Sequence, residues 1–298
     1  MKIVIAGASG MIGHALVPAL RAGGHDVVRL VRRVAVGADE IRWNPGAGEL
    51  DATRLEGCDA IVNLCGENIA GGRWTARRRQ RIWNSRTDAT RTLVVALGQL
   101  ARKPAVFVNA SAIGIYGDRG GEELTEASAI GHGFLPELCF AWETHAEGAA
   151  KRGVRTVLLR FGVVLAREGG ALAKMLPIFR FGLGGRLSDG RQWLSWVSRD
   201  DAVGAIQHVI SEAQCSGPMN VVAPGAVTNA EFAAKLALML WRPAALAVPA
   251  ALLRFGFGQM AQETVLASAR VRPAKLAAAG YKFRHATLEE ALRAAMQS

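Results

Sequence analysis

Three glycines near the start of the chain have the spacing of a loop that binds phosphate groups. Gly7, Gly10 and Gly13 stand three residues apart, directly after the apolar run 3–6, and an apolar pattern at helical spacing follows over 11–20. This pattern predicts a strand, a tight turn and a helix N-terminus. Backbone N–H groups and the positive end of the helix dipole bind phosphate at such a turn. We therefore predict a dinucleotide-binding loop, although glycines also occur in ordinary turns.

The residues after the second predicted strand, 26–31, indicate which dinucleotide is bound. A site for NAD(H) would place an acidic residue about 20 residues beyond the glycines, against the ribose 2′-hydroxyl. Arg32 and Arg33 stand there instead, and a guanidinium can hold a 2′-phosphate with two parallel bonds. The sequence therefore predicts NADP(H) as the cofactor; the alternative is that both arginines are merely solvated. Asp39 and Glu40 are expected in a loop.

The elements that would position these residues alternate between strand and helix through the first half of the chain. Near-continuous apolar strands between helices predict a Rossmann-type α/β fold, a doubly wound parallel sheet with a smaller C-terminal substrate lobe. Ligands then bind at the carboxyl ends of the strands. The expected strands are 60–64, 105–110, 156–161 and 219–222, and the expected helices are 75–101, 136–152, 201–213 and 229–240.

The 298 residues, half of them hydrophobic, suffice for one large core and a smaller lobe. We expect an NADP(H)-binding Rossmann domain over 1–165, to which later segments return. A mixed substrate lobe should cover 166–245, and its glycines at 169–170, 182, 184–185 and 190 predict that this part of it is rich in loops. A C-terminal helical domain of unknown function should cover 246–298.

The net charge of +11 raises the question of nucleic acid, but the arginines are scattered apart from the run 77–81. We expect that run to form a solvated helix face with one or two members reaching cofactor phosphate, and we predict no nucleic-acid partner. Four cysteines without metal spacing indicate a reducing cytoplasm and no metal site. No apolar stretch approaches about 18 residues, so no membrane association is predicted. The substrate and the oligomeric state cannot be deduced from the sequence.

Motifs along the whole chain resemble one known family. They are residues 7–13, 63–69, 72–75, 111–117, 160–165, 184–185, 192–197, 220–224, 272–276 and 280–281. The chain resembles the atypical extended short-chain dehydrogenase/reductase superfamily of the NAD-dependent epimerase/dehydratase type. More closely, it is similar to the "epimerase family protein" subgroup, which carries a C-terminal domain of unknown function. The resemblance implies a nicotinamide cofactor, and its site is expected at Gly7, Ser9, Gly10, Met11, Ile12, Gly13, Arg32, Arg33, Leu64, Cys65, Gly66, Glu67, Ala110, Ser111 and Arg160.

The chain departs from this superfamily in its catalytic motif. The usual catalyst is Tyr-x-x-x-Lys on one helix, in which the lysine lowers the phenol pKa and holds the ribose. The two tyrosines, Tyr116 and Tyr281, have no lysine four residues on. Leu138 and Trp142 are expected at the two catalytic positions.

Ser111 and Tyr116 are the remaining candidates for catalysis. Ser111 is expected at the superfamily serine's strand end, and Tyr116 is the phenol expected near a nicotinamide, where it would donate a proton. The alternative for Tyr116 is a packing role, and Glu67 is a second acid/base candidate. Arg160 would position cofactor or substrate phosphate. Two functions stay open: an NADP(H)-dependent oxidoreductase or epimerase-like enzyme on a small substrate, and a non-catalytic NADP(H)-binding sensor or scaffold.

Overall fold

Seven parallel strands form the central sheet of the protein, whose computed structural model describes residues 1–297. The chain starts near the middle of the sheet and builds outward in both directions, so its order reverses between β1 and β4. Such a reversal opens a crevice at the carboxyl ends of the two strands. In spatial order the strands are β3 (Glu40–Arg42), β2 (Asp26–Val31), β1 (Lys2–Ala6), β4 (Ala60–Asn63), β5 (Val106–Ala112), β7 (Arg155–Phe161) and β12 (Gly217–Val221).

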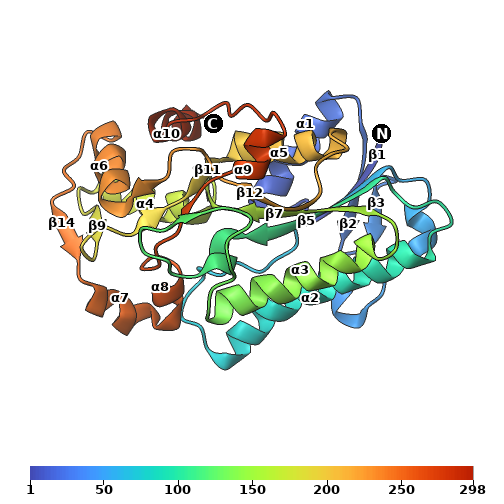
Figure 1. The fold of residues 1–298 in the computed structure, drawn as a ribbon, viewed down its shortest axis with the longest axis horizontal. Coiled ribbons are helices and arrows are strands. Elements are labelled where there is room, and N and C mark those ends of the chain that lie inside the picture. The colour runs from blue at the N-terminus through green and yellow to red at the C-terminus, as the bar shows by residue number, and fades with distance from the viewer. Residues whose placement is uncertain (298) are drawn as a thin grey trace.

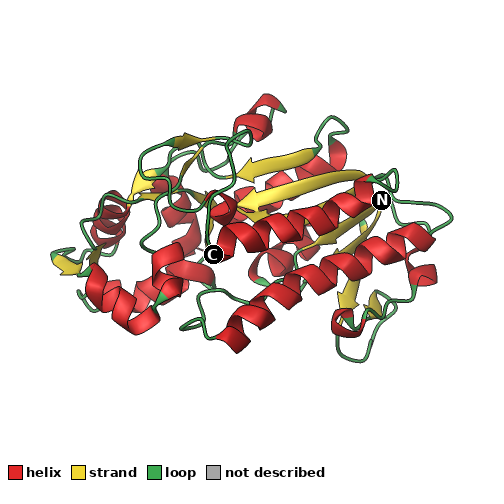
Figure 2. Ribbon diagram, turned by 60° about the horizontal axis from the view of Figure 1, so that its bottom comes forward, coloured by secondary structure: helices red, strands yellow, loops and turns green. Residues whose placement is uncertain are grey.

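Helices cover both faces of this sheet (Figure 1), and Figure 2 shows its strands between the helices. One face packs on α1 (Met11–Ala22) and α5 (Arg199–Ser211), the other on α2 (Ala76–Gln99) and α3 (Phe134–Ala150). Successive side chains of β1 point to opposite faces of the sheet. Ile3 and Ile5 therefore belong to the hydrophobic core on the α1 and α5 side, and Val4 belongs to the core on the α2 and α3 side. The predicted doubly wound Rossmann-type sheet is confirmed.

Hydroxyl side chains fix where several helices begin. Thr75 Oγ1 accepts a hydrogen bond from the backbone N–H of Arg78 at the start of α2, and Ser198 Oγ accepts one from Asp201 at the start of α5. These caps satisfy N–H groups that have no partner inside the helix. The observed helices therefore begin within two residues of the predicted starts, 75 and 201.

A smaller lobe follows β7 and lies at the left end of Figure 1. Its core holds Trp196 and Phe232, both nearly inaccessible to solvent. Its elements are β8 (Val163–Leu165), α4 (Gly170–Arg180), β9 (Gly185–Leu187), β10 (Trp193–Leu194), β11 (Trp196–Ser198), β13 (Val227–Thr228) and α6 (Asn229–Met239).

The C-terminal segment lies along both lobes. Its strand β14 (Leu246–Val248) pairs with β9, and its strand β15 (Arg270–Val271) pairs with β6 (Glu123–Leu124), which precedes α3. Its helices are α7 (Ala250–Phe257), α8 (Gln259–Glu263), α9 (Ala274–Ala278) and α10 (Leu288–Gln297).

Two segments expected to be loops are regular structure. Glu40 opens β3 and is buried, because it pairs with arginines that follow or lie on β2. Helix α4 forms within the glycine-rich region because Leu172, Leu176 and Phe179 bury one of its faces. Tertiary contacts, rather than local propensity, decide both cases.

Candidate functional site

The glycine loop joins β1 to α1, and its three glycines are needed for different reasons. Gly7 has φ +84°, and a Cβ there would lie 2.7 Å from the carbonyl carbon of Leu64. A Cβ on Gly13 would lie 2.4 Å from the oxygen of Gly7. A Cβ on Gly10 would meet only that same oxygen, at 3.3 Å, and its φ of −76° suits any residue. Gly10 therefore leaves room for a ligand, whereas Gly7 and Gly13 allow backbone packing.

The N-terminus of α1 can receive an anion at this loop. Ser9 and Gly10 are exposed, Met11 and Ile12 are partly exposed, and no acidic side chain stands in the first turn of the helix. Backbone N–H groups at a helix start combine with the helix dipole to attract phosphate. The residues present therefore fit the pyrophosphate of a dinucleotide.

The loop after β4 lies against the glycine loop and borders the same crevice. Besides Leu64, the nitrogen of Cys65 would contact a Cβ on Gly7, at 3.0 Å. The backbone N–H of Glu67 donates to Ser85 on α2, which holds this loop in place. Burial raises the pKa of the Cys65 thiol to about 12, so it is no nucleophile near neutral pH.

The two arginines after β2 differ in their partners. Arg33 donates two hydrogen bonds, of 2.6 and 2.7 Å, to the carboxylate of Glu40. This pair, with the backbone N–H of Val36, lowers the pKa of Glu40 to about 2. Arg32 is exposed at the end of β2 and has no ion pair within residues 1–297. The structure thus leaves Arg32 available for a 2′-phosphate, while Glu40 occupies Arg33.

A buried chain of polar side chains connects β5, α3, β7 and β12. Ser111 Oγ donates to Glu143 Oε1 at 2.6 Å, and Arg160 donates to both Glu143 oxygens at 2.8 Å. Arg160 Nη1 also donates to the Tyr116 oxygen at 2.9 Å, and the Tyr116 hydroxyl donates to Asn220 Oδ1 at 2.8 Å. No member is more than 6% exposed. The chain is a satisfied structural network of the kind that fixes a core.

This network bears on three of the predicted site residues. Tyr116 is fully buried at the end of the 3-10 helix Ile113–Tyr116, and burial raises its pKa although Arg160 opposes this. Burial lowers the pKa of Arg160, but the carboxylate of Glu143 has the larger effect and holds that pKa above its usual value. The geometry therefore argues against proton donation by Tyr116 with Ser111 and against a phosphate contact of Arg160, because their polar atoms are already paired. Ala110 is buried on the same strand.

Tyr116→Phe tests this structural role. Removal of the hydroxyl leaves Arg160 Nη1 and Asn220 Oδ1 without their shared partner, and we expect a loss of about 1–3 kcal/mol in the free energy of unfolding. Urea denaturation measures it, with cofactor titration as the companion experiment. Unchanged stability together with a roughly 100-fold slower reaction would instead make Tyr116 the proton donor.

The face of α3 that should carry the superfamily catalyst is buried. Leu138 packs in an apolar cluster, and Trp142 Nε1 donates to Thr90 Oγ1 at 2.9 Å. Thr90 in turn accepts from Asn63, which also donates to Asn109. The carboxyl ends of β4 and β5 are therefore joined to α2 and α3 by amide and hydroxyl groups rather than by a lysine.

A cavity of about 230 Å³ opens beside the end of β5, under the C-terminal segment. Both carboxylate oxygens of Glu263 on α8 accept backbone N–H groups at the start of α3, from Phe134 at 3.2 Å and Leu135 at 2.8 Å. Exposed His132 is one of the lining residues. The full lining is Gly114, Gly117, Asp118, His132, Leu135, Pro136, Gln262, Glu263 and Ala267.

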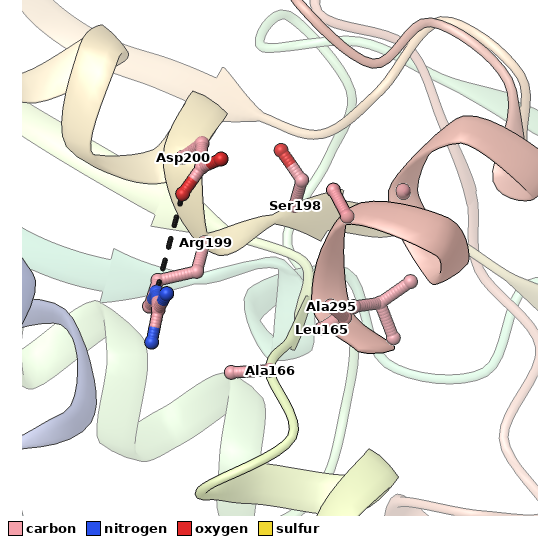
Figure 3. A pocket seen from close by; sticks show the side chains of 8 residues that line it. Leu165, Ala166, Ser198, Arg199, Asp200 and Ala295 are labelled. Atoms are coloured by element: carbon pink, nitrogen blue, oxygen red, sulfur yellow. Dashed lines mark ion pairs between the residues drawn. The ribbon is translucent and has the colours of Figure 1, made fainter. Parts of the chain in front are cut away.

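A second hollow, at the start of α5, is too small to be a ligand site. Ser198, Arg199 and Asp200 line it together with Ala295 of α10 (Figure 3), and its volume is about 10 Å³, the size of one water molecule at most. Within residues 1–297 no group of three or more His, Cys, Asp or Glu side chains could hold a metal ion. No helix in the same range is long and apolar enough to cross a bilayer.

The sheet order, the glycine loop and the open helix N-terminus together define a dinucleotide-binding Rossmann protein. The chain belongs to the NAD dependent epimerase/dehydratase family, whose sequence pattern matches residues 3–222. Residues 248–295 match a domain of unknown function, DUF1731. The resemblance to the epimerase family with this C-terminal domain is thereby confirmed.

Individual relatives support this assignment over almost the whole chain. Epimerase family protein Mb2239 of Mycobacterium bovis is 44% identical, covering 97% of this chain and 96% of its own. Epimerase family protein YfhF of Bacillus subtilis is 35% identical, covering 98% and 97%. The crystal structure of human epimerase family protein SDR39U1 with NADPH superposes with a TM-score of 0.91 at 32% identity, covering all of both chains.

Proposed function

We propose that the protein is an NADP(H)-dependent oxidoreductase that reduces a small polar substrate. The preference for NADP(H) is supported by Arg32, which is exposed beside the glycine loop without a carboxylate partner in residues 1–297. It is supported further by the human relative, whose structure contains NADPH.

The cavity under the C-terminal segment carries the proposal. It begins at Gly114, two residues beyond the end of β5, where open α/β sheets bind their ligands. Its volume of about 230 Å³ lies just below the range of about 300–1,000 Å³ that is usual for ligand pockets, so its occupant would be small. Apolar Leu135 and Pro136 and polar Asp118, His132 and Glu263 line it together, and this mixture suits a small molecule with one or two hydrogen-bonding groups.

His132 is the proposed proton donor, because Tyr116 and Ser111 are occupied by the buried network. A histidine side chain within hydrogen-bond reach of a substrate can act as a general acid and give up a proton during the reaction. When bound, the nicotinamide would supply the hydride to a carbonyl carbon. His132 would deliver the proton to the carbonyl oxygen and regain it from water.

This function can be tested with a panel of small aldehydes and ketones. The fall in NADPH absorbance at 340 nm measures the reduction of each compound. For any reduced substrate, we expect His132→Gln to lower kcat by about 100-fold or more and leave NADPH affinity unchanged. His145→Gln is the matched control, since His145 lies on α3 and does not line the cavity. Equal kcat for wild type and His132→Gln would remove His132 from the mechanism.

The second candidate function is a non-catalytic NADP(H) sensor or scaffold. The burial of Leu138 and Trp142 at the usual catalytic positions favours it, because that helix face offers no free acid or base. Tight NADPH binding without turnover of any panel member, together with a protein partner captured only in the presence of NADPH, would establish this function over the first.

A further inference from the structure

Exposed apolar side chains gather at the end of the small lobe, on α4, α6, β14 and the loops after the two helices. Figure 1 shows these elements together at its left end. Arg242 Nε, just after α6, donates to the Arg180 carbonyl at the end of α4, at 2.8 Å. The exposed apolar residues, which we call the lobe-end patch, are Ile178, Phe181, Leu183, Leu238, Trp241 and Leu246. Apolar groups exposed together in this way mark interaction sites.

Trp241 is the most exposed member of the lobe-end patch, at 89%. Its backbone φ is +54°, a conformation that bulky residues rarely adopt. A tryptophan contributes to stability mainly when its large ring is buried, and here almost all of the side chain faces solvent. Packing and backbone preference within residues 1–297 therefore do not account for Trp241, whereas a partner that covers the ring does.

The charges around the lobe-end patch have one sign. Residues 171–188 and 232–262 contain lysine and arginine but no aspartate or glutamate. Arg180, Arg186 and Arg242 are exposed, and none of them has an ion pair within residues 1–297. A second copy of this chain would set the same surface on both sides of the interface, and these cations would then repel one another. The patch therefore suits a partner that carries carboxylates.

Strand β14 offers an open sheet edge within the lobe-end patch. It pairs with β9 alone among residues 1–297, and Leu246 and Ala247 are exposed. The backbone N–H of Ser188 donates to the Val248 carbonyl at 2.8 Å. Because successive residues of a strand direct their backbone groups to opposite neighbours, the N–H and C=O of Ala247 point away from β9. Such an edge is a template for one more strand.

The pairing of β14 with β9 indicates which side chains an added strand would need. Leu246 and Val248 point to one face of this two-stranded sheet, and Ala247 points to the other. Ala247 stands beside Arg186 of β9, so these two residues share a face. An added strand would therefore place apolar side chains beside Leu246 and Val248, and an acidic side chain beside Ala247 on the face of Arg186.

A protein segment fits these features better than an anionic lipid surface does. Lipid would also attract apolar groups and cations, but its hydrocarbon offers no partner to the backbone N–H and C=O of an open edge. We infer that the lobe-end patch is a docking surface for an extended segment of another protein, in which apolar residues alternate with Asp or Glu and which adds a third strand beside β14. This interaction is separate from the proposed reaction and its cofactor.

Fluorescence anisotropy with a labelled synthetic peptide of alternating Val and Glu tests the inference. We expect the wild type to bind it at least about tenfold more tightly than a matching peptide of alternating Val and Lys. Ala247→Pro removes the outward N–H and is compatible with an edge strand, so it should weaken binding about tenfold or more without a change in Tm.

Two variants test the side chains of the lobe-end patch. Arg186→Glu should weaken binding of the Val and Glu peptide about tenfold or more, because it places a carboxylate against the acidic residues. Trp241→Gly should also weaken binding and leave the fold intact, because glycine accepts a positive φ. Arg54→Glu is the matched control for charge, since Arg54 is exposed in the 3-10 helix Ala52–Leu55, outside the small lobe.

Three results would overturn the inference. The first is no binding of the Val and Glu peptide, equal binding of the two peptides, or unchanged binding by Ala247→Pro. The second is a wild-type dimer in sedimentation that Trp241→Gly dissociates, because a second copy would then cover the patch. The third is binding to phosphatidylglycerol vesicles that Arg186→Glu loses and Ala247→Pro keeps, because the patch would then bind a lipid surface.

Discussion

Gly10→Val is expected to abolish cofactor binding while the protein stays folded. The valine Cβ would touch only the Gly7 oxygen, at 3.3 Å, and its methyl groups would enter the space assigned to the pyrophosphate. We expect NADPH affinity to fall by at least about 100-fold, about 2.8 kcal/mol. Calorimetry measures the affinity and thermal denaturation checks the fold.

Two further glycine variants are controls for Gly10→Val. Gly256→Val adds the same side chain at an exposed position of α7 with no atom within 4 Å and should bind NADPH as the wild type does. Gly13→Ala should unfold the protein, because its Cβ would lie 2.4 Å from the Gly7 oxygen. Wild-type affinity in Gly10→Val would mean that the loop is only a turn.

Arg32→Ala is expected to remove the preference for NADPH over NADH. We expect the wild type to bind NADPH at least about tenfold more tightly, about 1.4 kcal/mol, because a guanidinium binds a phosphate with two charge-assisted bonds. The variant should bind both cofactors with similar affinity. Titration of each protein with each cofactor gives the four dissociation constants that are needed.

Arg33→Ala is the matched control for Arg32. Arg33 is held by Glu40, so its loss should leave the cofactor preference intact. If Arg33→Ala removed the preference and Arg32→Ala did not, Arg33 would have to leave Glu40 when the cofactor binds. Equal affinity of the wild type for NADPH and NADH would remove both arginines from cofactor selection.

Periodicity and turn residues predicted the main sheet well. The strand expected over 26–31 is β2 without change, and the helix expected over 75–101 is α2, Ala76–Gln99. Long apolar patterns with capping residues at their ends explain this success. Strand β3 and helix α4 could not be predicted, because salt bridges and burial stabilise them rather than local pattern.

The glycine loop was recognisable from sequence, but the partners of the polar residues were not. Ser111 and Arg160 meet because β5 and β7 pair in a register that sets them opposite each other. Glu143 reaches both from α3. Spacing along the chain does not reveal such a register, and a carboxylate within an apolar helix was the one available signal.

The contact of Glu263 with the start of α3 couples ligand binding to the attachment of the C-terminal segment. The same segment supplies Gln262, Glu263 and Ala267 to the cavity wall, so the cavity is complete only while α8 is docked. Suppose that a ligand binds the cavity only while α8 is docked on α3. Docking then strengthens ligand binding, and by linkage the bound ligand stabilises the docked position of α8 by the same free energy. Occupancy of the cavity would therefore protect the region around α8 from proteolysis, and the domain of unknown function would act as a reporter of substrate.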